Sequence, residues 1–210
     1  MLHIVDDDAD LRESLLWMAM SRQIPAASYA SGEDFLAVVD PSLKQVRSGR
    51  NKKKIKYNFD PNGDCVLLDV RMGGLSGVAT FEHMIAKRLS RRIPVIFITG
   101  HGDVPMAVDV LKHGAFDFFE KPYDDNALFD CVEKAFLASI DACKLAAVYD
   151  RLDDLTLRER EVLNLILVGK MNKVIADDLG ISMRTVEVHR ANIFDKMEVK
   201  TAVELAGMLK

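Results

Sequence analysis

The sequence predicts two domains: an α/β domain built on a doubly wound parallel sheet of five strands, and an all-α domain of four helices. In the first part of the chain, uninterrupted apolar runs such as Cys65–Leu68 and Val95–Ile98 alternate with segments of helical periodicity. Such runs are typical of parallel strands, which are buried on both faces, and the alternation favours βαβ units. From Thr156 onward, helical segments follow one another, and three of them begin at a Ser or Thr cap.

The elements of the first domain can be placed in order along the chain. Turn residues such as Gly63 and Gly73 bound the apolar runs, and a cap such as Ser31 precedes a periodic segment. The expected strands cover residues 2–5, 27–29, 65–69, 94–98 and 116–119. The expected helices cover residues 10–22 and 31–39 and lie around residues 81–85 and 106–111. Their short connections indicate a parallel doubly wound sheet.

Composition excludes several classes of protein. The net charge of −4 does not by itself suggest a nucleic-acid binder, and the three cysteines show no CxxC pair or His/Cys ligand pattern. We expect reduced thiols, not a disulfide framework or a zinc site. The chain passes from Met1 through a short apolar run into Asp6, unlike a secretory signal, and no apolar stretch approaches membrane-spanning length. We therefore expect a soluble cytoplasmic protein without a membrane partner.

Five polar side chains stand where expected strands end. Asp6 and Asp7 follow the first strand and Asp69 ends the third; Thr99 and Lys121 follow the fourth and fifth. In a parallel sheet these ends share one edge, so the side chains should converge. Three carboxylates repel one another unless a hard cation neutralises them, which predicts a Mg²⁺ site. Alone, Asp69 would be an ordinary turn-capping residue, and its partners favour the site.

This set of residues is typical of phosphoryl transfer to a carboxylate. Mg²⁺ and an ammonium group offset the charge of the phosphoryl oxygens, and the carboxylate attacks to form an aspartyl phosphate. A phosphatase of the haloacid-dehalogenase type would need a second aspartate two residues after Asp69 as general acid, where this chain has Arg71. We therefore expect a phosphoacceptor protein and not an enzyme.

The strand-end residues, the Thr99-Gly100 step and Lys121-Pro122 together resemble the receiver domain of bacterial two-component response regulators over residues 1–123. The resemblance implies that Asp69 is the phosphoacceptor. It also implies four Mg²⁺ contacts, with Asp7 as the more direct of the acidic pair and Arg71 contributing its backbone carbonyl: Asp6, Asp7, Asp69 and Arg71.

In the same resemblance, Thr99 and Lys121 would bind the phosphoryl oxygens, and Thr99 and Phe118 would form the switch. Phe118 lacks a hydroxyl group, so any switching there must work by packing alone. Two features depart from the receiver pattern. One is Gly73-Gly74 after Met72, where many receivers carry a proline; we expect a looser loop that has lost no ligand.

The other departure is a basic insertion at about residues 41–63. It contains seven Lys or Arg residues from Lys44 to Lys56, the most basic run of the chain. A solvated surface loop is the favoured interpretation, because long loops cost little stability and like charges extend them. A supplementary contact with DNA phosphates or a docking patch is the alternative.

Residues 124–150 are expected to form the last helix of the first domain and a helical linker. Asp124 can cap this helix, apolar residues recur every fourth position from Leu128 to Ile140, and helical character continues through Val148. A continuous helix would couple the two domains, whereas a break near Tyr149 would free them. The pattern allows both.

Residues 151–210 are expected to contain a helix-turn-helix. Two helices are joined by a turn at Gly180, and the second, which starts at Ser182, would enter the major groove of DNA. From Thr156 onward there are nine Lys or Arg residues against eight Asp or Glu. Binding must therefore depend on local placement of the basic residues on or beside the reading face, which are Lys173, Arg184, Arg190 and Lys196. His189 is interpreted as a core or backbone-bonded residue.

The pattern Leu155-Thr156, Glu159-Arg160-Glu161, Ile175-Ala176, Thr185-Val186 and His189 resembles the LuxR-type helix-turn-helix domain. The chain as a whole is thus similar to the FixJ/NarL family of response regulators, most of all to FixJ-like members. Glu187 would accept hydrogen bonds from cytosine amino groups or help to orient Arg190. By position, the residues facing DNA would be Lys173, Arg184, Thr185, Glu187, Val188, Arg190 and Ala191.

The resemblance implies a DNA-binding transcriptional regulator that phosphorylation activates. A cognate sensor histidine kinase would phosphorylate Asp69, and the face formed by the fourth helix, fifth strand and fifth helix would then dimerise. The partners implied are the kinase, promoter DNA, RNA polymerase and a second copy of the chain. An alternative of another class is a phosphotransfer or scaffolding protein whose C-terminal helices bind protein instead of DNA.

Overall fold

The computed structural model describes residues 1–40, 59–100 and 104–209. The chain divides into two compact units, residues 1–143 and 144–210. The predicted basic insertion is described only from residue 59, so the basic residues between Lys44 and Lys56 lie outside the described ranges. No helix within the described ranges is long and apolar enough to cross a membrane.

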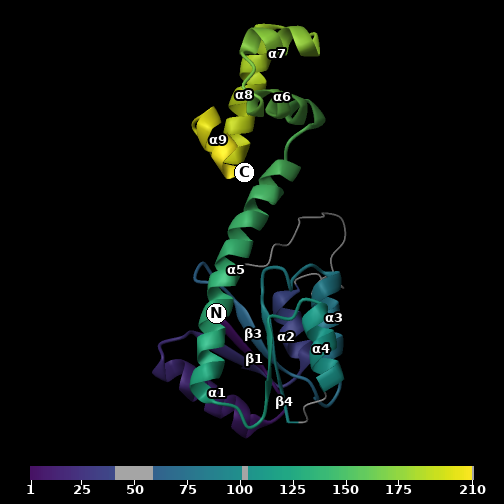
Figure 1. Cartoon of the computed structure of the whole chain (residues 1–210), viewed down its shortest axis with the longest axis vertical. Coiled ribbons are helices and arrows are strands. Elements are labelled where there is room, and N and C mark those ends of the chain that lie inside the picture. Colours follow the sequence, from purple (N-terminus) through teal and green to yellow (C-terminus); the bar gives the residue numbers. More distant parts are fainter. Residues whose placement is uncertain (41–58, 101–103, 210) are drawn as a thin grey trace. The chain divides into compact units, whose positions relative to one another are not determined.

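A parallel sheet of five strands lies at the centre of the first unit (Figure 1). Its order is β2-β1-β3-β4-β5, and every neighbouring pair is parallel. This arrangement confirms the predicted doubly wound α/β fold and puts β3, the strand that ends at Asp69, in the middle of the sheet. In the described ranges the strands are β1 (Leu2–Val5), β2 (Ala26–Tyr29), β3 (Cys65–Asp69), β4 (Val95–Thr99) and β5 (Asp117–Glu120).

The fifth strand lies one residue later than the apolar pattern predicted. It covers Asp117–Glu120 instead of residues 116–119. Phe116, which is 37% exposed, precedes the strand and donates its amide hydrogen to the carbonyl of Val95 at 2.7 Å. Because β5 is an edge strand, backbone pairing with β4 sets its limits, and apolar side chains are a poor guide to them.

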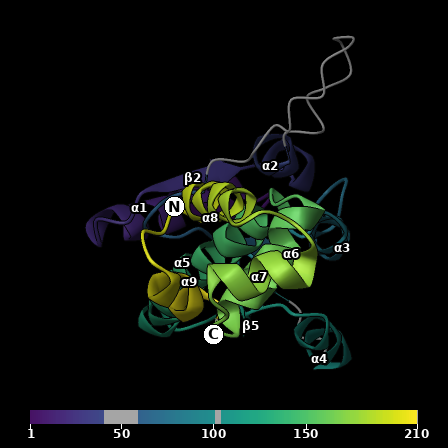
Figure 2. The ribbon, with the colours of Figure 1, turned by 90° about the horizontal axis from the view of Figure 1, so that it is seen from above.

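Helices cover both faces of this sheet (Figures 1 and 2). On one face, Val66 and Leu68 of β3 belong to a core that includes Phe35 and Phe81 of the covering helices. On the other face, Leu67 of the same strand packs in a second core. Successive residues of β3 therefore point to opposite cores, which explains its uninterrupted apolar run. The helices are α1 (Ala9–Ser21), α2 (Gly32–Val39), α3 (Gly77–Ala86), α4 (Val104–Lys112) and α5 (Asp125–Asp153).

The helix α5 begins in the first unit and ends in the second. As predicted, Asp124 caps it, with Oδ1 accepting a hydrogen bond from the amide of Ala127 at 2.8 Å. Its helical conformation continues through Tyr149 to Asp153, past the point where the sequence also allowed a break.

The second unit contains, in its described part, the end of α5 and four further helices around one core that includes Val162, Ile175, Val186 and Ile193. The predicted caps are present, since the side chains of residues 156, 182 and 201 each accept a hydrogen bond from the amide three residues later. Gly180 ends α7 with φ 64°, a left-handed conformation that glycine adopts without steric cost. The helices are α6 (Leu157–Leu167), α7 (Asn172–Leu179), α8 (Met183–Met197) and α9 (Ala202–Met208).

Candidate functional site

The carboxyl edge of the sheet brings three of the predicted strand-end side chains into direct contact. Lys121 Nζ lies 2.9 Å from Oδ2 of Asp6 and 2.8 Å from Oδ1 of Asp69. The two acidic residues are buried, with exposed fractions of 4% and 7%. Lys121 follows β5 at the edge of the sheet, and its long side chain crosses β4 to reach the ends of β3 and β1. The parallel topology thus assembles residues that lie more than a hundred positions apart in the sequence.

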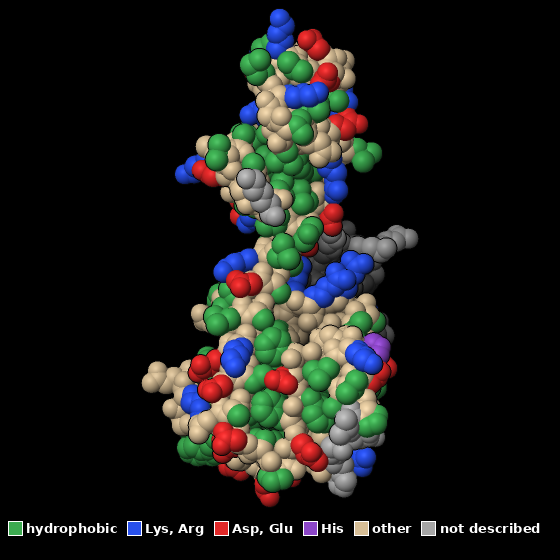
Figure 3. Space-filling view, viewed as in Figure 1, with side chains coloured by type: hydrophobic (Ala, Val, Ile, Leu, Met, Phe, Trp, Pro, Cys, Tyr) green, Lys and Arg blue, Asp and Glu red, His purple; other side chains and the backbone are tan. Residues whose placement is uncertain are grey.

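The charges of this cluster do not balance. Burial raises the pKa of Asp69; the hydrogen bond from Lys121 opposes this rise and the nearby Asp6 carboxylate adds to it, so the pKa stays above its usual value. Burial alone would lower the pKa of Lys121, but its hydrogen bonds to Asp69 and Asp6 outweigh burial and raise it. The ammonium group of Lys121 thus offsets only one of the two buried negative charges. Further acidic side chains lie on the surface at the same end of the first unit, toward which the strands run (Figures 1 and 3).

Each acidic side chain of this edge also accepts a hydrogen bond from a backbone amide. Oδ1 of Asp6 accepts from the amide two residues later at 2.8 Å. Oδ2 of Asp69 accepts from the amide of Arg71 at 2.7 Å, and Oδ2 of Asp7 accepts from the amide of Gly73 at 2.9 Å. These bonds fix the orientation of the carboxylates and tie the loop that follows β3 to two of them.

The chemistry of the donors suits a hard divalent cation, because every side chain offered is a carboxylate and added positive charge would offset the imbalance. Asp6 and Asp69 each use both oxygens in hydrogen bonds. Asp7 is exposed, and among the described contacts only its Oδ2 is engaged. In the described ranges no three acidic, histidine or cysteine residues are already arranged to hold a metal ion. The residues therefore have the chemical type that Mg²⁺ prefers, but at least one side chain would have to turn before all of them could bind the same ion.

The two predicted switch residues lie on neighbouring strands. Thr99 ends β4 with 1% of its surface exposed, and its carbonyl accepts a hydrogen bond from the amide of Lys121 at 2.7 Å. Phe118 is half-buried against the core that contains Phe35 and Phe81, and it pairs with Phe97 of β4. The hydrogen bond from the Lys121 amide to the Thr99 carbonyl thus connects the end of β4 to the lysine of the acidic cluster. Residues 101–103, which follow Thr99-Gly100, lie outside the described ranges.

In the second unit, the predicted DNA-facing residues lie on α7 and α8. Thr185 and Arg190 are half-buried, and the others are exposed: Lys173, Arg184, Glu187, Val188 and Ala191. On α8 the core residues Val186 and Ile193 point inward, so the exposed residues share the opposite side of the helix. A reading face of this kind can approach a ligand as large as a DNA duplex.

The two half-buried members are held by neighbouring side chains. The Thr185 hydroxyl lies 2.8 Å from Oγ of Ser182, and its amide donates to the same oxygen, so Thr185 is part of the helix cap. The Arg190 guanidinium lies 5.4 Å from the centre of the Phe194 ring. Among the described contacts, no ion pair joins Glu187 to Arg190, and the role of Glu187 in orienting this arginine stays a prediction.

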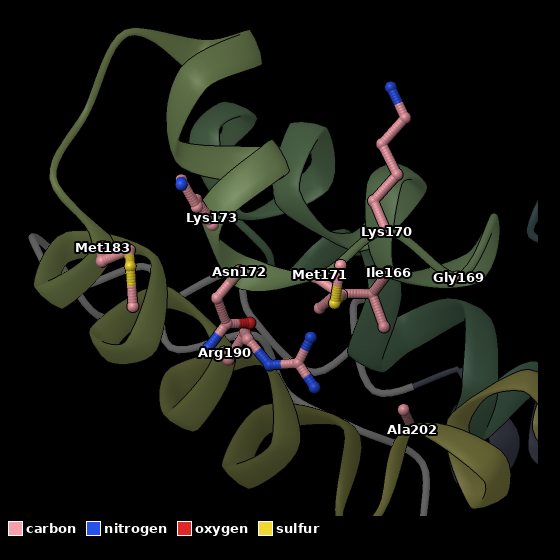
Figure 4. Close-up of a pocket in the computed structure, with 9 residues that line it drawn as sticks. All are labelled: Ile166, Gly169, Lys170, Met171, Asn172, Lys173, Met183, Arg190 and Ala202. Carbon is pink, nitrogen blue, oxygen red and sulfur yellow. The ribbon is translucent and has the colours of Figure 1, made fainter.

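A pocket of about 550 Å³ opens beside the reading face. Lys173 from the start of α7 and Arg190 from the middle of α8 both line it, together with Met171 and Met183 (Figure 4). The two methionines are 75% and 49% exposed. This pocket belongs to the same surface as the predicted DNA contacts.

Lys196 does not belong to this reading face, contrary to the sequence interpretation. Its Nζ lies 2.7 Å from Oε2 of Glu159, which is 3% exposed and also accepts from the amide of Thr156. Burial would raise the pKa of Glu159, but the bonds to Lys196 and Thr156 outweigh it and lower the pKa to about 2. The capping box identified Glu159, yet no sequence pattern indicates its contact with a lysine 37 positions away.

His189 is half-buried, and its Nδ1 is enclosed without a hydrogen-bond partner in the described part of the chain. This nitrogen makes no backbone bond of the kind that the sequence allowed.

Comparison with protein families matches both units. Residues 2–133 match the response regulator receiver domain, and residues 153–209 match the bacterial regulatory proteins of the luxR family. The chain is a response regulator. Its second unit is the LuxR-type DNA-binding domain, as the sequence predicted, and this match disfavours the alternative of a protein-binding scaffold.

Full-length relatives support the same assignment. The C4-dicarboxylate transport transcriptional regulatory protein DctR of Rhodobacter capsulatus is 42% identical, with 99% of this chain and 98% of the relative covered. The transcriptional regulatory protein FixJ of Rhizobium meliloti is 38% identical, with 99% and 93% covered. Crystal structures of full-length FixJ from B. japonicum give a TM-score of 0.52 at 34% identity, with 99% and 94% covered. The response regulator is thus FixJ-like.

Proposed function

We propose that Asp69 is the phosphoacceptor of this transcriptional regulator and that its phosphorylation by a sensor histidine kinase promotes dimerisation and promoter binding. The observation that carries the proposal is the bridge from Lys121 to the buried carboxylates of Asp69 and Asp6 at the carboxyl edge of the sheet. A DNA-binding domain follows the receiver in the chain. In this proposal phosphorylation therefore changes the state of the chain itself, and the chain does not act as an enzyme that releases a product.

In the proposed transfer, a carboxylate oxygen of Asp69 attacks the phosphorus of a phosphohistidine on the kinase. A P–O bond forms on Asp69 while the P–N bond to the histidine breaks. Lys121, which already lies 2.8 Å from Asp69, offsets the charge that arrives on the phosphoryl oxygens. The Thr99 hydroxyl, at the end of the next strand, would donate a hydrogen bond to one of these oxygens.

Mg²⁺ would be held by Asp6, Asp7, Asp69 and the carbonyl of Arg71, and it would supply the positive charge that this cluster lacks. Asp7 is well suited to this role because its carboxylate is exposed and Oδ1 is unengaged among the described contacts. Lys121 spans Asp6 and Asp69 and keeps the two buried carboxylates together. Their orientation is thus fixed before the phosphoryl group arrives, which lowers the cost of ordering the site.

The proposed signal passes from Thr99 to Phe118 and to the surface around it. Several apolar side chains are exposed on α4 and next to β5: Val108 at 44%, Leu111 at 41% and Phe116 at 37%. Burying them against a second copy of the chain would stabilise a dimer through the hydrophobic effect. A dimer would place two LuxR-type domains on the two halves of a promoter site in the cytoplasm, where RNA polymerase can be recruited.

The test uses the full chain with Mg²⁺ and acetyl phosphate, followed by intact-mass measurement and by light scattering after size exclusion. We expect the wild type to gain one phosphoryl group and to shift toward dimer. The Asp69→Asn variant should show neither change, while Glu13→Gln, which alters an exposed acid on α1, should match the wild type. Phosphorylation or dimerisation of Asp69→Asn at the wild-type level would overturn the proposal.

A further inference from the structure

The loop between β3 and α3 is held by carboxylates from three different elements. Alternate amides of this loop, those of residues 71, 73 and 75, donate to side chains of β3, of the β1–α1 loop and of α2. The distances are 2.7, 2.9 and 3.0 Å, and the acceptors in the same order are Asp69, Asp7 and Glu33. Two of these acceptors are the proposed phosphoacceptor and the most available Mg²⁺ ligand, so their chemistry and the position of the loop are coupled.

The middle bond requires an amide hydrogen at residue 73, which the glycine supplies. A proline, which many receivers carry here, has no amide hydrogen and could not donate to Asp7. The Asp7 carboxylate is thereby fastened to the loop, and within the described ranges it does not form a metal-binding group with Asp6 and Asp69. Lys121 occupies the facing oxygens of those two residues.

We propose that the Gly73 amide is a latch that competes with Mg²⁺ for Asp7. The inference rests on the proposed function, in which Asp7 is a metal ligand. In the described ranges Asp6, Asp7 and Asp69 are not arranged to hold one metal ion, so Asp7 must turn toward the other two even though its Oδ1 is unengaged, and this turn stretches or breaks its bond to Gly73. The affinity for Mg²⁺ is therefore lower by the free energy of that bond than it would be without the amide hydrogen.

Glu33 acts as the positioning residue that keeps the loop in place when the latch opens. Its Oε1 accepts from the amide of Leu75, which lies outside the acidic cluster and which a metal ion need not disturb. Between the two amides stands Gly74 with φ 91°, a conformation that favours glycine, and a Cβ there would come within 3.3 Å of the Glu33 carboxylate. Gly74 thus allows the backbone to bend between the Gly73–Asp7 bond, which breaks, and the Leu75–Glu33 bond, which is kept.

The test compares two variants at one position. Gly73→Pro removes the amide hydrogen, whereas Gly73→Ala keeps it and adds a Cβ whose nearest neighbour is 3.9 Å away. Mg²⁺ binding to the full chain is measured by titration calorimetry without a phosphodonor. We expect Gly73→Pro to bind Mg²⁺ about three- to tenfold more tightly than the wild type, which corresponds to the typical net contribution of one hydrogen bond at an exposed site. Gly73→Ala should stay within about twofold.

Amide hydrogen exchange measured by NMR gives a second readout that does not depend on phosphorylation. In the wild type, Mg²⁺ should speed exchange at the Gly73 amide and leave the Leu75 amide unchanged. In Glu33→Ala, exchange at Leu75 should be fast with and without Mg²⁺, whereas Glu33→Gln, which keeps an acceptor oxygen, should protect Leu75 as the wild type does.

The outcomes separate the latch from the proposed function. If the wild type binds Mg²⁺ but the proline and alanine variants bind it equally well, or proline weakens binding, the latch is wrong and the metal site stands. If the wild type does not bind Mg²⁺, both fail. A tighter proline variant together with faster Gly73 exchange in the wild type supports the latch.

Discussion

The two units of this response regulator differ in where they place the charged residues of their candidate sites. In the receiver unit, Asp6 and Asp69 are buried and bonded to Lys121, whereas in the LuxR-type unit Lys173 and Arg184 are exposed. Buried charges perturb one another and the stability of the fold, while exposed charges are screened by solvent. Function and stability are therefore coupled in the receiver and largely separable on the DNA-binding face.

Burial alone does not identify a functional charge. The LuxR-type unit has its own buried carboxylate, Glu159, but this residue is paired with Lys196 and caps α6. Its pKa is lowered, whereas that of Asp69 is raised. The difference is that Glu159 has the donors it needs, and Asp69 shares one ammonium with a second carboxylate. Charge imbalance, and not burial, therefore distinguishes the proposed phosphorylation site from Glu159.

The largest expected effect tests how tightly the receiver site is built. A Cβ at Gly77 would lie 2.1 Å from the carbonyl oxygen of Asp69, a clash with backbone that no rotamer can relieve. We expect Gly77→Ala to lower the free energy of unfolding of the receiver unit by about 3 kcal/mol. Denaturant unfolding followed by fluorescence of Trp17, the single tryptophan of the chain, measures this unit.

The matched control for this prediction is a helical glycine of the other unit. Nothing lies within 4 Å of a Cβ at Gly207. Gly207→Ala should therefore be neutral or stabilise α9 by up to about 1 kcal/mol. Equal effects of the two alanine substitutions would contradict the view that the Asp69 backbone leaves no room at Gly77.

The next effect tests the buried pair of the LuxR-type unit. Glu159→Gln keeps an acceptor for the cap but leaves Lys196 without a carboxylate, and it should cost about 2 kcal/mol. Glu161→Gln on the same helix alters a 52% exposed carboxylate and should cost less than about 0.5 kcal/mol. Thermal unfolding followed by circular dichroism compares them, and equal losses would show that burial of Glu159 has no energetic importance.

This pair also predicts a pH dependence. The folded pKa of Glu159, about 2, lies below the usual 4.5, so the folded state binds the proton less readily than the unfolded state. Its contribution is fully present above pH 4.5 and is lost as the pH falls toward 2. The wild type should therefore lose more stability than Glu159→Gln over this interval. Parallel curves would contradict the lowered pKa.

A smaller effect is expected on the DNA-binding face. Lys173→Ala removes an exposed cation and should weaken binding to a promoter fragment about tenfold, while the dependence of log K on log salt falls by about one. Lys196→Ala should leave this dependence unchanged because its ammonium is committed to Glu159. Binding isotherms at several salt concentrations measure both. A similar change for both lysines would mean that the ion pair opens on DNA.

The smallest effect has the opposite sign. Because burial and the nearby Asp6 carboxylate raise the pKa of Asp69, its ionised form is disfavoured in the fold, and Asp69→Asn should slightly increase the free energy of unfolding of the receiver unit at neutral pH. The gain should shrink as the pH falls through the raised pKa, since the wild-type side chain then takes up its proton. Trp17 fluorescence during unfolding measures it, with Glu13→Gln as the control. If Asp69→Asn is instead less stable than the wild type, the attraction between Asp69 and Lys121 outweighs the repulsion between Asp69 and Asp6.

Much of the architecture followed from local rules in the sequence. The apolar runs of β3 and β4 are buried on both faces and therefore lack alternation, and the Ser and Thr caps mark helix starts at residues 156, 182 and 201. Parallel topology then requires strand ends to share an edge, so the meeting of Asp6, Asp69 and Lys121 could be expected from the sequence. These features depend on neighbours in sequence or on a general rule of sheet construction.

Tertiary structure alone decided which partner each charged group takes. The sequence could not assign Lys196 to Glu159, the amide of Gly73 to Asp7, or the Phe194 ring to Arg190. Hydrogen bonds and ring contacts depend on distances of a few ångströms between segments, and many pairings satisfy the same pattern of residue types. Packing selects one of them, and that selection separates structural charges from those left free to bind a ligand.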